Sequence, residues 1–362
     1  MSIDLIPTAL RGSLTVVCAA VLLAVFAAPS RTDRELPPDM RELILNSIDL
    51  VYKEKFKSAE DEARMVIKKY PDHPAGYFFC AAALESWMSF YESDKREEEF
   101  YEYCDQAIDK AEKQLAREPD NDWATFFLGG ADGFKGTYES RYEKWITSFR
   151  HGWRGVSTLM TLHKKNPDIK DVYYGLGMYD YWRSAMTKVL WWMPGIENRS
   201  REGIQELEIA RKEGVYTSLS AAANLVIVYN AEGRFKDALT IAEELLARYP
   251  ASVKCSWGKA AALYGLGRFD EDESVYRYIL ERVEAEPMDN HYNAVLCHFW
   301  LAKIYLKMKR YTQSIAECNR MGYYNLDEGI KKRLDKFYAE AGKIKEQAKA
   351  SNVKNPEAEM VP

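Results

Sequence analysis

The chain has 362 residues, of which 47% are hydrophobic and 29% are charged, and its formal net charge at pH 7 is -5. A chain of this size can bury a large interior, either as several domains or as one extended array of repeats. Because the balance is acidic and no sustained basic block precedes the last predicted helix, we expect no nucleic-acid binding.

Residues 1–30 have the layout of an export signal. Arg11 precedes an apolar run at 13–28, and a polar, proline-containing linker at 31–37 follows it. We therefore expect an exported protein, periplasmic or secreted, in which this segment is either cleaved as a signal peptide or kept as a membrane anchor. No later segment has the length and apolar character of a membrane span.

A first helical hairpin is predicted over 38–71, and three longer units follow over 72–215. Pro71, Pro119 and Pro167 each precede Asp and lie 48 residues apart. Small side chains keep this interval, and they predict where paired helices cross, since small residues let two helix backbones approach closely. The crossing pairs are Ala81 with Ala107, Gly129 with Gly155, and Gly177 with Gly203.

The paired positions are 26 residues apart in these units and 12 apart in ordinary units, as for Ser47 with Ala59. The spacing therefore predicts three elongated hairpins, with each helix longer by about seven residues, or two turns. Their tips are rich in aromatic side chains, for which two interpretations stay open: packing between hairpins, or contact with a partner or a lipid surface. The candidate partner-binding residues are Tyr138, Tyr142, Trp145, Trp182, Trp191, Trp192 and Met193.

Three shorter hairpins are predicted over 216–328. The phrases GRFKDA and GRFDED recur with Gly233 and Gly267 34 residues apart, and apolar side chains lie at helical spacing on both sides of each glycine. This pattern predicts a helix, a tight turn and an antiparallel helix, with Ala238 at a crossing position. A lysine-rich capping helix is predicted at 329–349, followed by a disordered tail at 350–362.

The unit at 224–250 resembles the tetratricopeptide repeat, and matching residues are Leu225, Tyr229, Gly233, Phe235, Ala238 and Pro250. The next unit departs from the pattern at Asp272, where the family prefers Ala, and the third has Lys309 in place of the turn glycine. The resemblance covers about residues 38 to 328. It implies an all-α fold, an α-solenoid of about seven antiparallel helix hairpins in a TPR-like right-handed superhelix, plus a C-terminal capping helix.

The resemblance also implies a scaffold that binds a protein or peptide partner without chemistry of its own. In this family the first helix of each pair lines a concave groove, where Asn224, Lys259 and Lys303 are candidate contacts. Ordinary solvated polarity is the competing interpretation of these three side chains.

Catalysis is not predicted. The five histidines are scattered among different units, no catalytic or phosphate-binding motif occurs, and we expect neither a metal nor a cofactor. Two alternatives stay open: an envelope assembly factor that contacts lipid through its tips, and a helical toroid that acts on glycans. A toroid would bring the two chain ends together, whereas an open superhelix keeps them apart.

Cys297 and Cys318 are nearly level across one predicted antiparallel hairpin. Export makes a disulfide between them a candidate, although helix pairs often hold Cα atoms beyond the roughly 7 Å limit for such a bond.

Overall fold

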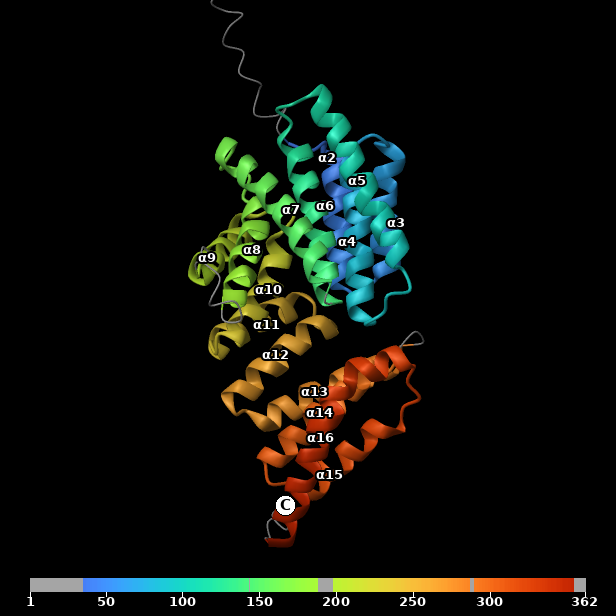
Figure 1. Cartoon of the computed structure of the whole chain (residues 1–362), viewed down its shortest axis with the longest axis vertical. Coiled ribbons are helices and arrows are strands. Elements are labelled where there is room, and N and C mark those ends of the chain that lie inside the picture. Colours follow the sequence, from blue (N-terminus) through green and yellow to red (C-terminus); the bar gives the residue numbers. More distant parts are fainter. Residues whose placement is uncertain (1–34, 143, 188–197, 287–289, 355–362) are drawn as a thin grey trace, which may run out of the picture.

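The computed structural model describes residues 35–142, 144–187, 198–286 and 290–354. Within these ranges the chain forms fifteen α-helices, a short 3-10 helix and no strand (Figure 1). Successive helices pair as antiparallel hairpins, so the predicted all-α solenoid is confirmed. In the described part of the chain, no helix combines the length and hydropathy needed to cross a membrane.

The first four hairpins pair α2 (Pro38–Tyr52) with α3 (Phe56–Lys69), α4 (Pro74–Phe90) with α5 (Glu97–Arg117), α6 (Asp122–Arg141) with α7 (Trp145–Lys165), and α8 (Val172–Thr187) with α9 (Ser200–Glu213). The last three pair α10 (Ser218–Ala231) with α11 (Phe235–Arg248), α12 (Val253–Leu266) with α13 (Phe269–Glu284), and α14 (Tyr292–Lys307) with α15 (Tyr311–Arg320). The 3-10 helix η2 (Met321–Tyr323) and α16 (Glu328–Lys354) close the array.

Helix α16 extends beyond the predicted capping helix. We predicted a disordered tail from residue 350, but the helix continues to Lys354. Ala348 is fully buried, and no proline or glycine interrupts the residues after it until Pro356, so the helix gains one more turn.

Two of the three predicted long hairpins contain unusually long helices, whereas the described helices of the third, α8 and α9, have 16 and 14 residues. Helices α5, α6 and α7 have 21, 20 and 21 residues, whereas α10, α11 and α12 have 14 each. Helix α4 has only 17 residues, and a turn at 91–96 takes up the rest of the first unit's extra length. The tip of the third long hairpin, at 188–197, lies outside the described residues.

The small residues lie where the backbones meet. A Cβ added at Gly155 would come within 2.6 Å of the Gly129 carbonyl oxygen, and one at Gly177 within 2.7 Å of the Gly203 carbonyl oxygen. Ala81, Ala107 and Ala238 are fully buried. In two ordinary hairpins a serine occupies the crossing, and its hydroxyl donates to the opposite carbonyl oxygen at 2.8 Å: Ser47 to Ala59 and Ser314 to Ala302.

Distant hairpins pack across the interior of the array. Tyr249 donates its hydroxyl to Asp49 at 3.0 Å, and its ring lies 5.5 Å from that of Tyr52. The Lys254 amide donates to the Glu54 carboxylate at 3.0 Å. Helix α2 lies in the upper part of Figure 1 and α16 in the lower part, so the chain does not close into a ring. The interior, however, is not an empty groove, because α2 fills part of it.

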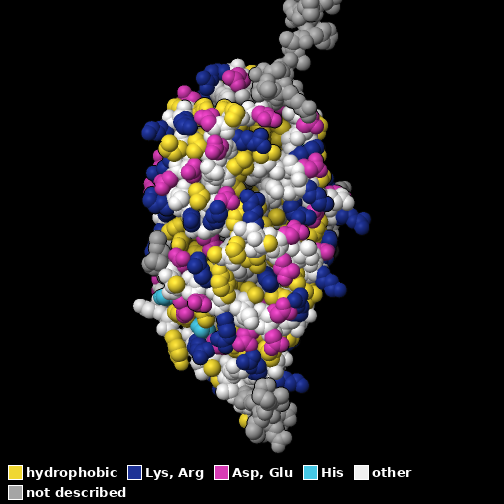
Figure 2. All heavy atoms as spheres, turned by 180° about the vertical axis from the view of Figure 1, so that it is seen from behind, with side chains coloured by type: hydrophobic (Ala, Val, Ile, Leu, Met, Phe, Trp, Pro, Cys, Tyr) yellow, Lys and Arg dark blue, Asp and Glu magenta, His cyan; other side chains and the backbone are white. Residues whose placement is uncertain are grey.

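Charges of both signs are mixed on the surface. The face seen in Figure 2 shows Lys and Arg side chains interspersed with Asp and Glu, and hydrophobic side chains lie between them. No large basic field covers this face, in agreement with the acidic net charge.

Candidate functional site

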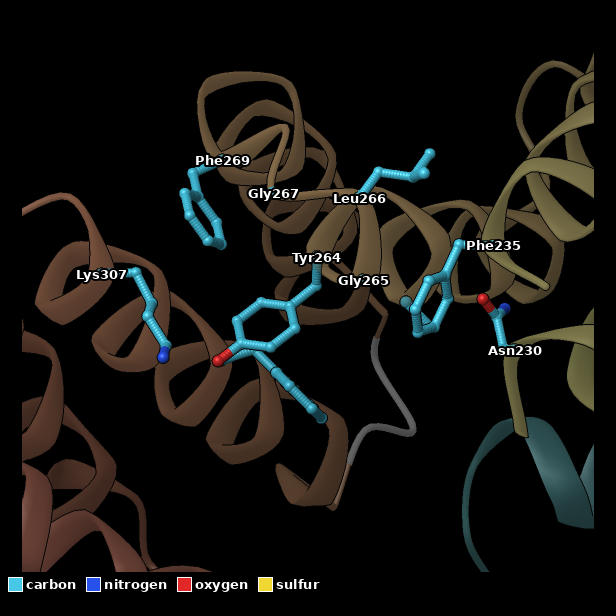
Figure 3. Close-up of a pocket in the computed structure, with 10 residues that line it drawn as sticks. Asn230, Phe235, Tyr264, Gly265, Leu266, Gly267, Phe269 and Lys307 are labelled. Atoms are coloured by element: carbon cyan, nitrogen blue, oxygen red, sulfur yellow. The ribbon is translucent and has the colours of Figure 1, made fainter. Parts of the chain in front are cut away.

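A hollow of about 630 Å³ lies along the edge of the array where the turns of successive hairpins line up (Figure 3). We call it the turn-edge groove. It is lined by Asn230, Phe235, Ala261, Tyr264, Gly265, Leu266, Gly267, Phe269, Trp300 and Lys307. Three hairpins therefore contribute to one surface, and Tyr264 lies between Phe235 and Lys307 in Figure 3.

Glycines and aromatic rings shape this groove. A Cβ at Gly265 would come within 2.3 Å of the Phe235 ring, so only glycine lets that ring pack against α12. Gly267 has a φ of +72°, which reverses the chain after α12 and brings Phe269 back beside Tyr264, with ring centroids 5.7 Å apart. Trp300 packs edge-on against Tyr264 at 5.2 Å.

The groove has a polar border. Lys307 is exposed and forms no ion pair with any residue that the structure describes. Burial raises the pKa of the Tyr264 hydroxyl, which stays protonated and can donate a hydrogen bond. Rings, a hydroxyl and an ammonium group together suit a segment that carries apolar and acidic side chains. The lining residues include no carboxylate, cysteine or histidine that could act as a nucleophile or a base.

A second, smaller hollow of about 330 Å³ lies between α9 and the turn that joins α10 to α11. It is lined by Ser200, Arg201, Ile204, Gln205, Glu232 and Arg234. Arg234 is paired with Asp237 at 2.7 Å and lies over the Tyr229 ring at 4.0 Å, so this cation already has partners within its own hairpin.

Each of the three predicted groove residues has a partner within the chain. Asn224 donates to the Tyr174 hydroxyl at 3.1 Å, in the interior between α8 and α10. Lys259 pairs with Glu243 at 3.4 Å, and Lys303 pairs with Glu340 at 2.9 Å. Each is therefore engaged by its own chain. Lys303 lies near the turn-edge groove, with its ammonium nitrogen 4.7 Å from the centroid of the Trp300 ring.

The aromatic tip residues divide into two groups. Tyr138 is fully buried, with its ring centroid 5.0 Å from that of Phe100 and 4.9 Å from that of the half-buried Tyr142. Trp145 and Trp182 are exposed. Trp191, Trp192 and Met193, which we singled out from the sequence, lie outside the described residues.

Three exposed residues near Trp145 escaped the sequence analysis. Ile146, Phe149 and Trp153 lie on α7, and each shows half or more of its surface to solvent. Their signal was present in the sequence, because Trp145, Phe149 and Trp153 are spaced four residues apart and so share one helix face. That spacing does not indicate whether the shared helix face is exposed or buried.

The candidate disulfide between Cys297 and Cys318 is not formed. Cys318 is a free thiol whose sulfur lies 3.4 Å from the carbonyl oxygen of Ala341, on the side of α15 that faces α16. Cys297 is buried in a different cluster, together with Tyr276 and Ile279 of α13. The two cysteines are nearly level along the hairpin, but they point into different layers of the solenoid.

Two buried acidic side chains, Asp132 and Glu60, pair with cations of their own or neighbouring hairpins. The Asp132 carboxylate accepts from Arg154 at 2.6 Å and lies 3.2 Å from the His151 ring nitrogen. Arg96 donates to Glu60 at 3.0 Å. Within the described ranges, no group of three or more His, Cys, Asp or Glu side chains is placed to hold a metal ion.

Comparison with known proteins identifies one part of the chain. Residues 223–287 match the family model described as tetratricopeptide repeat. They span α11, α12, α13 and most of α10, which supply most of the turn-edge groove. No curated protein matches the chain in sequence.

Three solved structures are similar to the chain. A tetratricopeptide repeat protein from Parabacteroides merdae is 15% identical, with a TM-score of 0.39, over 84% of this chain and 100% of its own. TTC0263, a thermophilic TPR protein in Thermus thermophilus, is 15% identical, with a TM-score of 0.39, over 62% and 99%. A human IFIT1 dimer with PPP-AAAA is 14% identical, with a TM-score of 0.43, over 91% and 83%. At these values, the three structures carry no argument about function.

Proposed function

Because this chain is a tetratricopeptide-repeat protein of unassigned subfamily, we propose that it is a non-catalytic scaffold that binds a protein or peptide partner. The turn-edge groove is the observation that carries this proposal. It is the larger of the two hollows described here, and most of its lining comes from the residues that match the repeat.

The lining indicates what kind of segment the groove would take. Phe235, Tyr264 and Trp300 offer aromatic surface for apolar side chains, and Lys307, which pairs with no residue that the structure describes, offers a cation at one border. An extended or helical segment with apolar residues and one acidic residue near Lys307 satisfies both features. Nucleic acid fits poorly, because the net charge is negative and the surface charges are mixed.

Site-specific crosslinking tests the groove. A photoreactive amino acid placed at Leu266, which lines the groove, should crosslink the full-length protein to a defined partner in its native cells. The same amino acid at Tyr323, which is 78% exposed and does not line the groove, is the matched control. Lys307→Glu should abolish the crosslink at 266, whereas Lys57→Glu on the exposed face of α3 should not.

Two results would contradict the proposal. One is a set of crosslinked products that is the same from positions 266 and 323, and the other is a crosslink at 266 that Lys307→Glu leaves unchanged. Both would show that the groove does not select its partner.

We also propose that the protein works in an exported compartment, as residues 1–30 suggest. Cell fractionation followed by N-terminal sequencing tests this. A mature N-terminus near residue 30 in the exported fraction supports a cleaved signal, and an intact N-terminus in the membrane fraction supports an anchor. An intact protein in the cytosolic fraction would contradict both.

The glycan-active alternative finds no support in the groove. Glycoside hydrolysis needs two carboxyl groups placed across the scissile bond, and neither hollow offers such a pair. The larger lining has no carboxylate, and the smaller one has only Glu232. Binding without catalysis is therefore the function that the geometry favours.

A further inference from the structure

Helix α7 carries a row of exposed hydrophobic side chains at its N-terminal end. Trp145, Ile146, Phe149 and Trp153 are 55%, 88%, 66% and 50% exposed, and we call them the α7 stripe. Single exposed hydrophobic residues are common on soluble proteins, but a contiguous group marks a surface that contacts something. The stripe is about 12 Å long, as eight residues of helix rise that far.

The hairpin's own packing does not use the stripe. Helix α7 meets α6 through another face, where the Ser148 hydroxyl donates to the Gly136 carbonyl oxygen at 2.8 Å and Gly155 approaches Gly129. Farther along α7, neighbouring side chains cover the helix, and Val156 and Leu159 are buried. The stripe lies in the part of α7 nearest the hairpin tip, on the N-terminal side of the residues that neighbouring side chains bury.

Helix α8 extends the same exposed surface. The Tyr179 ring lies 6.3 Å from that of Trp153, which is the C-terminal residue of the stripe. Trp182, 44% exposed, follows Tyr179 by three residues and therefore lies on the same side of α8. Figure 1 shows α6, α7 and α8 next to one another in the upper part of the molecule.

The border of the stripe is cationic. Helix α7 contains two arginines and two lysines and no Asp or Glu. Arg150 lies one residue after Phe149, is exposed, and forms no ion pair with any described residue. Arg154 pairs with the buried Asp132, and Lys144, just before the helix, pairs with Glu97 at 3.0 Å. Arg150 is thus the cation available to an outside partner.

These features favour a lipid surface over other occupants. Tryptophan, phenylalanine and isoleucine beside arginine form the side-chain set of a helix that lies in the boundary of an anionic bilayer. A second copy of the chain would place cationic borders against each other. We propose that the α7 stripe binds the surface of an anionic phospholipid bilayer, with its rings among the headgroups and Arg150 at the phosphates. This proposal does not depend on the turn-edge groove.

Tryptophan quenching by brominated lipid tests the proposal on the full-length chain. Residues 1–34 contain no tryptophan, so the leader itself carries no fluorophore that the lipid could quench. Vesicles of brominated phosphatidylglycerol and phosphatidylcholine should quench the fluorescence, whereas vesicles of brominated phosphatidylcholine alone should quench it several-fold less. Raising the salt concentration should weaken the effect, since exposed charges are then screened.

Matched variants locate the contact. The triple variant Trp145→Ser, Ile146→Ser, Phe149→Ser should lose most of the lipid-dependent quenching, beyond the share expected from removing one of nine tryptophans. The control triple Ile227→Ser, Tyr323→Ser, Val353→Ser removes exposed hydrophobic residues from other helices and should quench like wild type. Arg150→Glu keeps every ring and should weaken vesicle binding at least tenfold. Circular dichroism melting confirms that each variant is folded.

Three outcomes would overturn the proposal. Quenching that persists in the stripe triple places the lipid contact elsewhere. Equal quenching by neutral and anionic vesicles removes the role of Arg150. A wild-type dimer in light scattering that the stripe triple converts to a monomer, with no lipid-dependent quenching, shows that a second copy covers the stripe.

Discussion

The long N-terminal hairpins and the ordinary C-terminal hairpins differ in the residues that lie where their two helices cross. In the long hairpins formed by α6–α7 and α8–α9, glycine pairs bring two backbones into direct contact. In the ordinary hairpins, Ser314 bridges the same gap with a hydroxyl, and Asp272 fills it with a buried carboxylate. Glycine on both helices gives the closest backbone approach, because an added side-chain atom at the crossing would push the two helices apart.

The largest effect is expected at a glycine crossing. Gly155→Ala would place a Cβ 2.6 Å from the Gly129 carbonyl oxygen, and neither backbone can yield without separating α6 from α7. We expect a loss of about 3 kcal/mol or more in unfolding free energy, measured by urea denaturation. Gly152→Ala on the same helix meets nothing within 4 Å and should be neutral or stabilising by up to about 1 kcal/mol. Equal losses of unfolding free energy in the two variants would show that the close contact at Gly155 does not determine the effect.

A pH-dependent effect is expected at Asp272. Its side chain is fully buried, neither carboxylate oxygen has a hydrogen-bond partner among the described residues, and desolvation raises its pKa to about 8. An ordinary Asp has a pKa near 3.9 in an unfolded chain, so the folded protein retains this proton between about pH 4 and pH 8. This group's contribution to stability therefore falls as pH rises through that window.

Asp272→Ala restores the residue that the repeat family prefers and should flatten this dependence. We expect a gain of roughly 2–3 kcal/mol at pH 9, with little or no gain at pH 4. Thermal melting from pH 4 to pH 9 measures both limits. A gain that does not change with pH would show that Asp272 is not the titrating group.

A loss of stability of intermediate size is expected at the contact between the first long hairpin and the C-terminal helices. Arg333 of α16 donates to the Glu92 carbonyl oxygen at 2.9 Å and also pairs with the Glu92 carboxylate, while Asn293 donates to the Phe90 carbonyl oxygen at 2.8 Å. Arg333→Ala should cost about 2 kcal/mol and increase amide hydrogen exchange at 90–96. Unchanged exchange in that turn would show that the contact does not hold the two regions together.

A smaller effect is expected at a serine crossing. Ser314→Ala keeps the side chain small but leaves the buried Ala302 carbonyl without the hydroxyl that donates to it. We expect a loss of about 1 kcal/mol by urea denaturation, well below that of Gly155→Ala. A loss as large as the glycine variant's would mean that the two kinds of crossing are equivalent.

The smallest effect is expected at a turn. Lys309 has a φ of +62°, close to the +71° and +72° of Gly233 and Gly267 at the corresponding turns. Lys309→Gly should stabilise the last hairpin by up to about 1 kcal/mol, because glycine adopts this conformation without strain. The melting temperature measures it, and Gly267→Ala should shift that temperature in the opposite direction.

Most of the helical architecture follows from the sequence, and much less of the site does. The interval of 48 residues and the paired small side chains pointed to long hairpins, and α5, α6 and α7 are long, whereas α9 has the 14 residues of an ordinary helix. The sequence did not show that Lys259 and Lys303, chosen for a concave groove, pair with acidic residues of their own chain, and their part in binding stays a prediction. Phe235 and Trp300, which line the turn-edge groove, were visible only as repeat and aromatic residues.

The sequence by itself determined the helical hairpins, their turns and their crossing positions, because helix periodicity, glycine turns and small contact residues act over a few neighbouring residues. Only the tertiary structure decided which rings are buried, into which layer each cysteine points and what fills the interior. Those outcomes depend on residues such as Asp49 and Tyr249, which are 200 positions apart and meet only when the array curves. No local sequence pattern indicates such a long-range contact. Tyr138 and Trp145 therefore look alike in the sequence, although Tyr138 is buried and Trp145 is exposed.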